Sequence, residues 1–262
     1  MANNARFLEG QHAVVTGGSR GIGAAIAGDL ARAGASVTLM SRSGDSLRQQ
    51  ADSLKKEARA RVGYAECDVT DGSAIKSAMA SATKESGPVT ILINNAGAAE
   101  GAPFAKMTRE IWDRMISVNL TSAFLFSVEV IPTMLEARQG RIVNVSSTAG
   151  LRGYKTMTAY CAAKHGVIGL TRALALETAK HGVTVNAVCP GYTDTQLTDG
   201  SVEKLAGVFG QTLEEARAML VRTIPRGSLI TPEEVASAVT WLCSPAAAGV
   251  TGIALPIAGG EV

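Results

Sequence analysis

A tyrosine and a lysine four residues apart are the first candidates for acid–base chemistry in this sequence. Tyr160 and Lys164 fall within a predicted helix, so their side chains lie on one face of it. A phenol ordinarily has a pKa of about 10, and a neighbouring ammonium group stabilises its phenolate. A shift of the Tyr160 pKa to about 7 takes roughly 4 kcal/mol, of which Lys164 could supply much. The alternative is that the pair belongs to an ordinary solvated helix face.

Two adjacent serines could supply a hydroxyl beside this tyrosine. Ser146 and Ser147 follow the apolar run of residues 141–145, where the fifth predicted strand ends. Ligands in open α/β sheets bind outside the carboxyl ends of the strands, so a hydroxyl there can hold a carbonyl oxygen while Tyr160 delivers a proton. Residue chemistry alone favours neither serine, and either could instead cap a helix or a turn.

Asn119 is a polar residue on an otherwise apolar stripe. It follows Ile111 and Met115 at four-residue steps in the predicted helix of residues 109–138. A buried amide needs hydrogen-bond partners, or it costs stability. Asn119 could hold a water molecule that relays protons to Lys164, or it could be a satisfied core residue at a contact between helices.

The scaffold for these residues is predicted to be a single α/β domain, residues 1–262. Short apolar runs alternate with longer amphipathic stretches, which is typical of a doubly wound parallel sheet with helices on both faces. The predicted strands span residues 12–16, 36–40, 62–67, 89–93, 141–145, 183–188 and 252–256. The predicted helices span residues 22–33, 45–58, 71–86, 109–138, 158–181 and 232–242.

Residues 190–225 break this alternation. A Gly-, Asp- and Thr-rich stretch is followed there by a short predicted helix, residues 213–221. An insertion of this length inside a compact domain usually has a function, so we expect a substrate loop or lid.

A glycine-rich turn joins the first predicted strand to the first helix. Gly17, Gly21 and Gly23 permit a sharp turn, let backbone N–H groups approach a pyrophosphate and favour the anion at the helix N-terminus. Glycines also occur in strand-to-helix turns for steric reasons alone, but the position directly between the first strand and the first helix favours a dinucleotide site.

The end of the second strand predicts which dinucleotide binds. Ser41 and Arg42 stand where a carboxylate would bind a ribose 2′-hydroxyl, and Arg20 in the glycine turn offers a second cation. Two guanidinium groups that converge on a 2′-phosphate favour NADP(H) over NAD(H). The positive charge of its oxidised nicotinamide could add to the lowering of the Tyr160 pKa by Lys164. The alternative is that Arg42 only caps a surface turn.

Taken in order, these motifs resemble those of the short-chain dehydrogenase/reductase family over about residues 8–260. The motifs are residues 16–23, Asp68-Val69, Asn94-Asn95-Ala96-Gly97, Asn119, Ser147, Tyr160-x-x-x-Lys164 and Pro190-Gly191. The resemblance implies a Rossmann-type fold with sheet order 3-2-1-4-5-6-7. It implies catalysis by Asn119, Ser147, Tyr160 and Lys164, with Ser147 preferred to Ser146 and Lys164 also binding the nicotinamide ribose.

The cofactor contacts expected from the glycine turn, the second strand and this resemblance form one set. Its members are Gly17, Ser19, Arg20, Gly21, Ile22, Gly23, Ser41, Arg42, Asp68, Val69, Asn95, Ala96, Gly97, Tyr160, Lys164, Pro190, Gly191, Thr193 and Thr195. Two positions depart from the family. Thr193 stands where an aliphatic residue is more usual, and Ala258 stands where an acidic residue commonly precedes two glycines.

The resemblance is nearest to 3-oxoacyl-thioester reductases, whose substrates are carried by acyl carrier protein or coenzyme A. Arg138 matches a basic position that meets the carrier, and Lys180-His181 lies where a second basic residue is expected. His181 replaces an arginine there, which favours coenzyme A, and Arg138 could be a solvated helix end. The runner-up is a general secondary-alcohol dehydrogenase with a pocket formed by residues 149–157 and 192–221.

A protein that senses NADPH without catalysis is the hypothesis from another class. The intact Ser147, Tyr160 and Lys164 argue against it, because a sensor does not need them. The family also implies a homotetramer formed through the helices of residues 109–138 and 158–181.

Composition limits the other possibilities. Of 262 residues, 46% are hydrophobic and 18% charged, which excludes disorder of the whole chain, and a net charge of +2 argues against nucleic acid and anionic membranes as partners. The polar residues 1–10 do not resemble a signal peptide, and we expect a cytoplasmic protein. The cysteines are far apart, so we predict neither a disulfide framework nor a metal site. They are Cys67, Cys161, Cys189 and Cys243.

Overall fold

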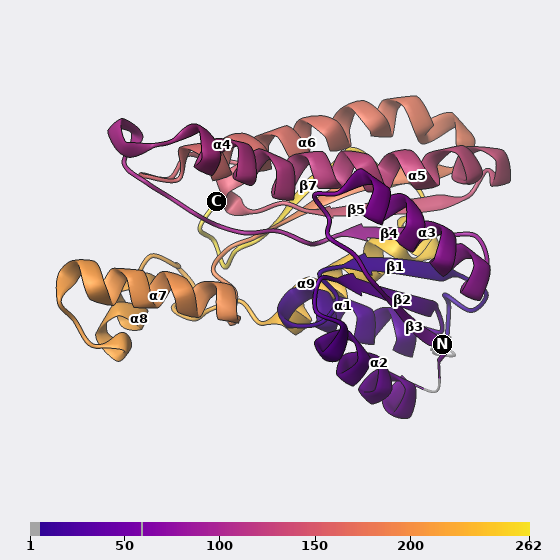
Figure 1. The fold of residues 1–262 in the computed structure, drawn as a ribbon, viewed down its shortest axis with the longest axis horizontal. Coiled ribbons are helices and arrows are strands. Elements are labelled where there is room, and N and C mark those ends of the chain that lie inside the picture. Colours follow the sequence, from indigo (N-terminus) through magenta and orange to yellow (C-terminus); the bar gives the residue numbers. More distant parts are fainter. Residues whose placement is uncertain (1–5, 59) are drawn as a thin grey trace.

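A computed structural model describes residues 6–58 and 60–262, and within them the chain forms a parallel sheet of seven strands (Figure 1). The strand order is β3-β2-β1-β4-β5-β6-β7, so the predicted order is confirmed. The strands are β1 (His12–Thr16), β2 (Ser36–Ser41), β3 (Val62–Glu66), β4 (Ile91–Asn94), β5 (Gly140–Val145), β6 (Val183–Pro190) and β7 (Ala254–Ile257). Every residue of β1 and β6 is buried, because helices cover both faces of the sheet.

The helices divide into two layers. They are α1 (Gly21–Arg32), α2 (Gly44–Ala58), α3 (Gly72–Ser86), α4 (Arg109–Ile116), α5 (Ser122–Ala137), α6 (Thr158–Thr178), α7 (Gln196–Phe209), α8 (Leu213–Val221) and α9 (Pro232–Cys243). Helices α1, α2 and α9 share one apolar core with the sheet, in which Leu30, Leu47 and Val239 are fully buried. Helices α3, α5 and α6 share the core on the other face, as Figure 1 shows.

The predicted helix of residues 109–138 is present, but it contains a π-helical turn that the sequence analysis did not predict. Helices α4 and α5 are joined by a π-helical turn, Ser117–Thr121, which contains the buried Asn119. A π turn inserts one residue into the helical repeat and changes the direction of the side chains that follow it, which an apolar periodicity does not show.

This combined helix is both long and apolar. By length and composition alone, Arg109–Ala137 would be long and apolar enough to cross a membrane. Its side chains Phe126, Val130 and Met134 are instead buried in the core that covers the sheet. The burial of these residues explains why a helix of an α/β domain is so apolar.

The predicted loop after Pro190 contains a helix that the sequence analysis missed. Helix α7 and the correctly predicted α8 pack on each other through a small separate cluster, and the pair stands out from the body of the protein (Figure 1). Gly200 and Gly207 lower the helix propensity of α7, and the Thr, Asp and Gly residues of its first half are typical of a loop. A capping box between Thr212 and Glu215 begins α8.

Candidate active site

The carboxyl edge of the sheet brings most of the candidate residues together. The glycine turn follows β1, residues 95–97 follow β4, Ser147 follows β5, and residues 191–195 follow β6. Tyr160 and Lys164 lie in the first two turns of α6, which begins at this same edge. Because all the strands are parallel, their carboxyl ends meet at one side of the molecule.

The structure separates the two serines. Ser146 is buried, and its Oγ donates a hydrogen bond to the carbonyl oxygen of Lys164 at 3.0 Å, so it ties β5 to α6. Ser147 is partly exposed, and its hydroxyl lies close enough to Tyr160 to lower the pKa of the phenol. Its Oγ also accepts a bond from the Ala149 amide at 3.1 Å, which begins a 3-10 turn. Only Ser147 therefore presents its hydroxyl to the tyrosine.

The acidity predicted for Tyr160 is wrong for the protein's own groups. Burial raises the pKa of Tyr160 to about 12, and the hydroxyl of Ser147 offsets only part of this rise. Tyr154 and Tyr192 lie close enough to raise the pKa of Tyr160 further. At neutral pH the phenol is therefore protonated.

Lys164 lies behind the tyrosine rather than against its hydroxyl. Its Nζ donates a hydrogen bond to the carbonyl oxygen of Val145 at 2.9 Å and stands 5.7 Å from the centroid of the Tyr160 ring. Burial lowers the pKa of Lys164 to about 8, because desolvation disfavours the ammonium form. The expected lowering of the phenol pKa fails because the surrounding protein desolvates both groups and the ammonium group donates to the main chain.

Asn119 uses its side chain to fix the chain after β4. Its Nδ2 donates to the carbonyl oxygens of Ala98, at 2.9 Å, and Met115, at 3.0 Å, while its Oδ1 accepts from the Ala98 amide at 3.2 Å. A Cβ added to Gly97 would lie 2.8 Å from Asn119 Oδ1 and 3.6 Å from Lys164 Nζ, so the glycine permits this close approach. The amide is therefore satisfied by protein groups, and one Oδ1 lone pair is left for a water molecule.

The glycine turn is shaped as a cradle for a phosphate. Gly17 and Gly21 have positive φ angles of 64° and 53°, and a Cβ on Gly23 would lie 2.3 Å from the carbonyl oxygen of Gly17. No side chain caps the N-terminus of α1 and no acidic residue lies in its first turn, so its free N–H groups favour an anion. The residues of this turn thus fit the pyrophosphate of a dinucleotide.

Thr16 holds the cradle in place and was not among the predicted site residues. Its Oγ1 accepts hydrogen bonds from the amides of Asn95, at 2.9 Å, and Ala96, at 3.0 Å. Asn95 returns a bond from Nδ2 to the Thr16 carbonyl oxygen at 2.9 Å. Asn95 therefore braces the glycine turn through its side chain. The position of Thr16, last in its strand and directly before the glycines, was the available signal.

The two predicted phosphate-binding arginines do not pair as expected. Arg20 donates a hydrogen bond to Gln196 Oε1 on α7 at 2.7 Å, so its guanidinium is engaged across the mouth of the site. Arg42 is exposed after β2. The pKa of Asp68 is lowered chiefly by the hydrogen bonds that this carboxylate accepts from Thr70, and to a smaller extent by the charge of Arg42. Ser41 Oγ beside it is buried and has no partner in the described chain.

The segment after β6 closes the site from the other side. Thr193 is buried, and its Oγ1 donates to the carbonyl oxygen of Gly191 at 3.1 Å. A Cβ on Gly21 would meet the Thr195 methyl group at 3.3 Å, so this segment lies against the glycine turn. Among the predicted cofactor contacts, Ser19 and Ile22 lie in the same turn, and Val69 is buried after β3.

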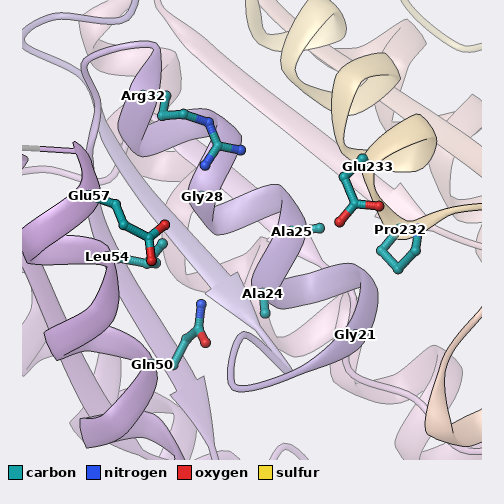
Figure 2. Close-up of a pocket in the computed structure, with 10 residues that line it drawn as sticks. All are labelled: Gly21, Ala24, Ala25, Gly28, Arg32, Gln50, Leu54, Glu57, Pro232 and Glu233. Carbon is teal, nitrogen blue, oxygen red and sulfur yellow. The ribbon is translucent and has the colours of Figure 1, made fainter.

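A groove between α1, α2 and α9 is a separate feature (Figure 2). It is lined by small residues of α1, including Ala24, Ala25 and Gly28, and shares only Gly21 with the cradle. Ser147, Tyr160 and Lys164 do not line it. Within the described chain, no group of three or more His, Cys, Asp or Glu side chains could hold a metal ion, and the four cysteines are buried free thiols.

Comparisons with known proteins agree with this geometry. The family model described as short chain dehydrogenase matches residues 11–206. The chain is 40% identical over 253 residues to the 3-oxoacyl-(acyl-carrier-protein) reductase FabG of Vibrio cholerae, covering 97% of this chain and 98% of that protein. It is 39% identical over 257 residues to the D-beta-hydroxybutyrate dehydrogenase of Cupriavidus necator, covering 98% and 99%.

A solved structure extends the likeness to three dimensions. A variant of actinorhodin polyketide ketoreductase, solved with NADPH, matches this fold with a TM-score of 0.93 at 37% identity. The match covers 100% of this chain and 99% of that one.

We predict that Gly23→Ala weakens the binding of NADPH about tenfold or more, because the methyl group displaces the Gly17 carbonyl and with it the N–H groups that face the phosphates. Titration of NADPH fluorescence measures the dissociation constant. Gly72→Ala is the matched control, since a Cβ there meets nothing within 4 Å. Equal affinities for the two variants would contradict the assignment of the cradle.

Proposed function

This chain belongs to the short chain dehydrogenase family, and we propose that it is an NADPH-dependent ketone reductase whose substrates are 3-oxoacyl thioesters. One observation carries the proposal. The neighbouring side chains of Ser147 and Tyr160 stand at the carboxyl edge of the sheet, with the buried Lys164 beside the tyrosine ring. The ketoreductase names among the relatives support this class of reaction.

The roles of the residues follow from where their polar atoms lie. When bound, NADPH supplies the hydride for the carbonyl carbon. Ser147 binds the carbonyl oxygen and polarises it, and Tyr160 donates the proton to the alkoxide that forms. Lys164 holds the ribose hydroxyls of the nicotinamide and supplies a positive charge behind the phenol. Asn119 fixes the chain at Ala98 and, through its remaining lone pair, orders a water molecule in the proton path to Lys164.

The protonation state of the tyrosine favours the reductive direction. With a pKa of about 12, Tyr160 carries its proton at neutral pH and is ready to act as an acid. The oxidative direction needs the phenolate, which the buried site disfavours in the protein alone.

The cofactor contacts extend from the glycine turn to the segment after β6. Pro190, Gly191, Thr193 and Thr195 hold the carboxamide, and Asp68 and Val69 border the adenine. Ser41 and Arg42 bind the 2′-phosphate, since a guanidinium and an unpartnered hydroxyl stand where a selective carboxylate would be needed for NAD.

Residues 190–225 serve as the substrate lid. Helices α7 and α8 stand out from the body and join it through segments beside Tyr192 and Ile230. The pocket that they close lies between them and residues 149–157.

Of the two carriers of a 3-oxoacyl thioester, we favour coenzyme A over acyl carrier protein. Arg138 donates from Nη2 to the carbonyl oxygen of Lys180 at 2.8 Å, so the two predicted carrier-binding segments are adjacent. Both precede the strands β5 and β6, and therefore lie at the amino edge of the sheet, a strand length from Ser147. Acyl carrier protein bound there would serve only the site of another copy, as in a homotetramer.

We expect a homotetramer in a reducing cytoplasm, and exposed apolar side chains on α5 and α6 agree with the tetramer. Phe124, Val128 and Leu176 are exposed on α5 and α6, where the family implies subunit contacts. A general secondary-alcohol dehydrogenase is the second candidate, which the hydroxybutyrate dehydrogenase relative favours.

We expect Tyr160→Phe to bind NADPH with unchanged affinity but to lose at least about a hundredfold in kcat for acetoacetyl-CoA, because the proton donor is removed. Ser147→Ala should lose a similar factor. Ser146→Ala, which removes a structural hydroxyl, should keep most of the activity. Initial rates on a panel of carbonyl compounds, measured with NADPH, test this. A panel on which the wild-type protein is inactive would instead support an NADPH sensor.

The pH dependence of activity should follow the protonation state of Lys164. Its ammonium form is present below a pKa of about 8 and is lost above it, so kcat/KM for NADPH should fall as the pH rises through about 8. Tyr160, with a pKa of about 12, should not limit activity in this range. Stopped assays at saturating ketone from pH 6 to 10 measure the profile, and a flat profile would be inconsistent with the role of Lys164.

Arg42→Ala should raise the dissociation constant of NADPH about tenfold and that of NADH less than about twofold, because only NADPH carries the 2′-phosphate. Arg61→Ala is the control, since this exposed arginine bonds to Glu85 at the amino edge of the sheet. Calorimetric titration of both dinucleotides gives the two ratios. The same loss for NADPH and NADH would show that Arg42 does not recognise the phosphate.

A further inference from the structure

Glu261, the penultimate residue of the chain, is a buried carboxylate that the proposed reaction does not use. Only 1% of its side chain is exposed. Its Oε1 accepts a hydrogen bond from Arg152 Nη2 at 2.8 Å and another from the Tyr154 hydroxyl. Its Oε2 is buried without a hydrogen-bond partner in the described chain. A buried carboxylate is costly unless it is paired, so Arg152 and Tyr154 must hold it firmly.

The chain bends back on itself to place this residue. Gly259 and Gly260 have φ angles of 59° and 89°, and the Gly259 carbonyl oxygen accepts a bond from the Arg226 amide at 3.0 Å. The turn therefore packs on the segment that leaves α8. Sequence analysis noted that Ala258, before these glycines, lacks the usual acidic residue, and the acid in this chain stands after them.

The carboxylate joins two segments that border Tyr160. Tyr154 is also hydrogen-bonded to Thr148 Oγ1, at 2.7 Å, in the turn that directly follows Ser147. On the other side, a Cβ on Gly191 would lie 2.9 Å from Glu261 Oε2. The guanidinium of Arg152 lies over the Tyr154 ring at 4.7 Å and also donates to the Glu261 carbonyl oxygen at 3.2 Å.

The same groups also influence the pKa of the Tyr160 phenol. Burial raises the pKa of Tyr192, and the charge of Glu261 raises it further. Tyr192 and Tyr154 in turn contribute to the raised pKa of Tyr160. The contacts of Glu261 thus lie on the substrate side of Tyr160, where residues 148–154 and 191–192 form opposite walls.

We propose that Glu261 is a positioning residue, which through Arg152 and Tyr154 holds residues 148–154 against Gly191 and so sets the shape of the ketone pocket before Tyr160. The proposal rests on the ketone reductase function. Glu261 acts mainly on the substrate, because the glycine cradle and Arg42 lie outside its contacts, and of the proposed carboxamide segment only Gly191 lies against it.

Steady-state kinetics of Glu261→Ala and Glu261→Gln test whether Glu261 sets the shape of the ketone pocket. We expect Glu261→Ala to raise the KM for the ketone about tenfold, with the dissociation constant of NADPH within about twofold of wild type. Glu261→Gln should lie between, since its amide oxygen still accepts one of the two bonds. Glu233→Gln, at an exposed glutamate of α9, is the matched control and should behave as wild type. Loss of thermal stability with unchanged KM would overturn the proposal.

Amide hydrogen exchange tests the positioning role of Glu261 independently of the ketone reductase function. Glu261→Ala should lose amide protection in residues 148–154 and 191–195, and Glu233→Gln should not, whether or not any ketone is a substrate. If wild-type protein reduces no ketone but exchange increases as expected, the function fails and the positioning contact remains. If wild-type protein is active and neither KM nor exchange changes in Glu261→Ala, the positioning role alone is wrong.

A double-mutant comparison tests the route through Arg152. Arg152→Gln leaves the carboxylate buried with one fewer partner, so it should lower Tm more than the double variant Arg152→Gln/Glu261→Gln. Additive losses in Tm would show that the two side chains do not act together, and would overturn this route.

Discussion

The approach of the Ser147 hydroxyl to Tyr160 is the constraint on which the site depends, and the parallel order of the sheet makes it possible. Ser147 follows β5, and α6 must begin at the same edge in order to return the chain to the start of β6. The serine and the tyrosine therefore meet although a loop separates them. Because the neighbouring strands end there too, the glycine cradle and the segment after β6 lie beside the same pair.

Burial sets the electrostatics of this pair more strongly than the nearby charge does. The phenol and the ammonium group are each desolvated, so their pKa values move in opposite directions, to about 12 for Tyr160 and about 8 for Lys164. Each shift favours the neutral form. A protonated tyrosine suits the delivery of a proton to a substrate, and the bond from Lys164 Nζ to Val145 keeps the cation near the cofactor side of the site.

Segments distant in sequence close the site around this centre. Arg20 reaches Gln196 on α7, Thr195 lies on Gly21, and Glu261 joins the two walls beside Tyr160. Through few residues, these contacts connect helices α7 and α8 to the carboxyl edge of the sheet. Loops positioned by a rigid scaffold are where an α/β fold varies its substrates, so specificity is expected to depend on these contacts.

The sequence by itself determined the sheet order, the glycine cradle and the set of candidate residues, because strand–helix alternation, glycine spacing and family motifs are local or ordered along the chain. Tertiary structure decided the rest. Which serine faces Tyr160 depends on packing against α6, and the direction of each pKa shift depends on burial. The π turn at Asn119 does not show in the apolar pattern, and the glycines and polar residues in the first half of α7 are typical of a loop. The partners of Arg20 and Glu261 lie more than 100 residues away, and no local pattern identifies contacts at that separation.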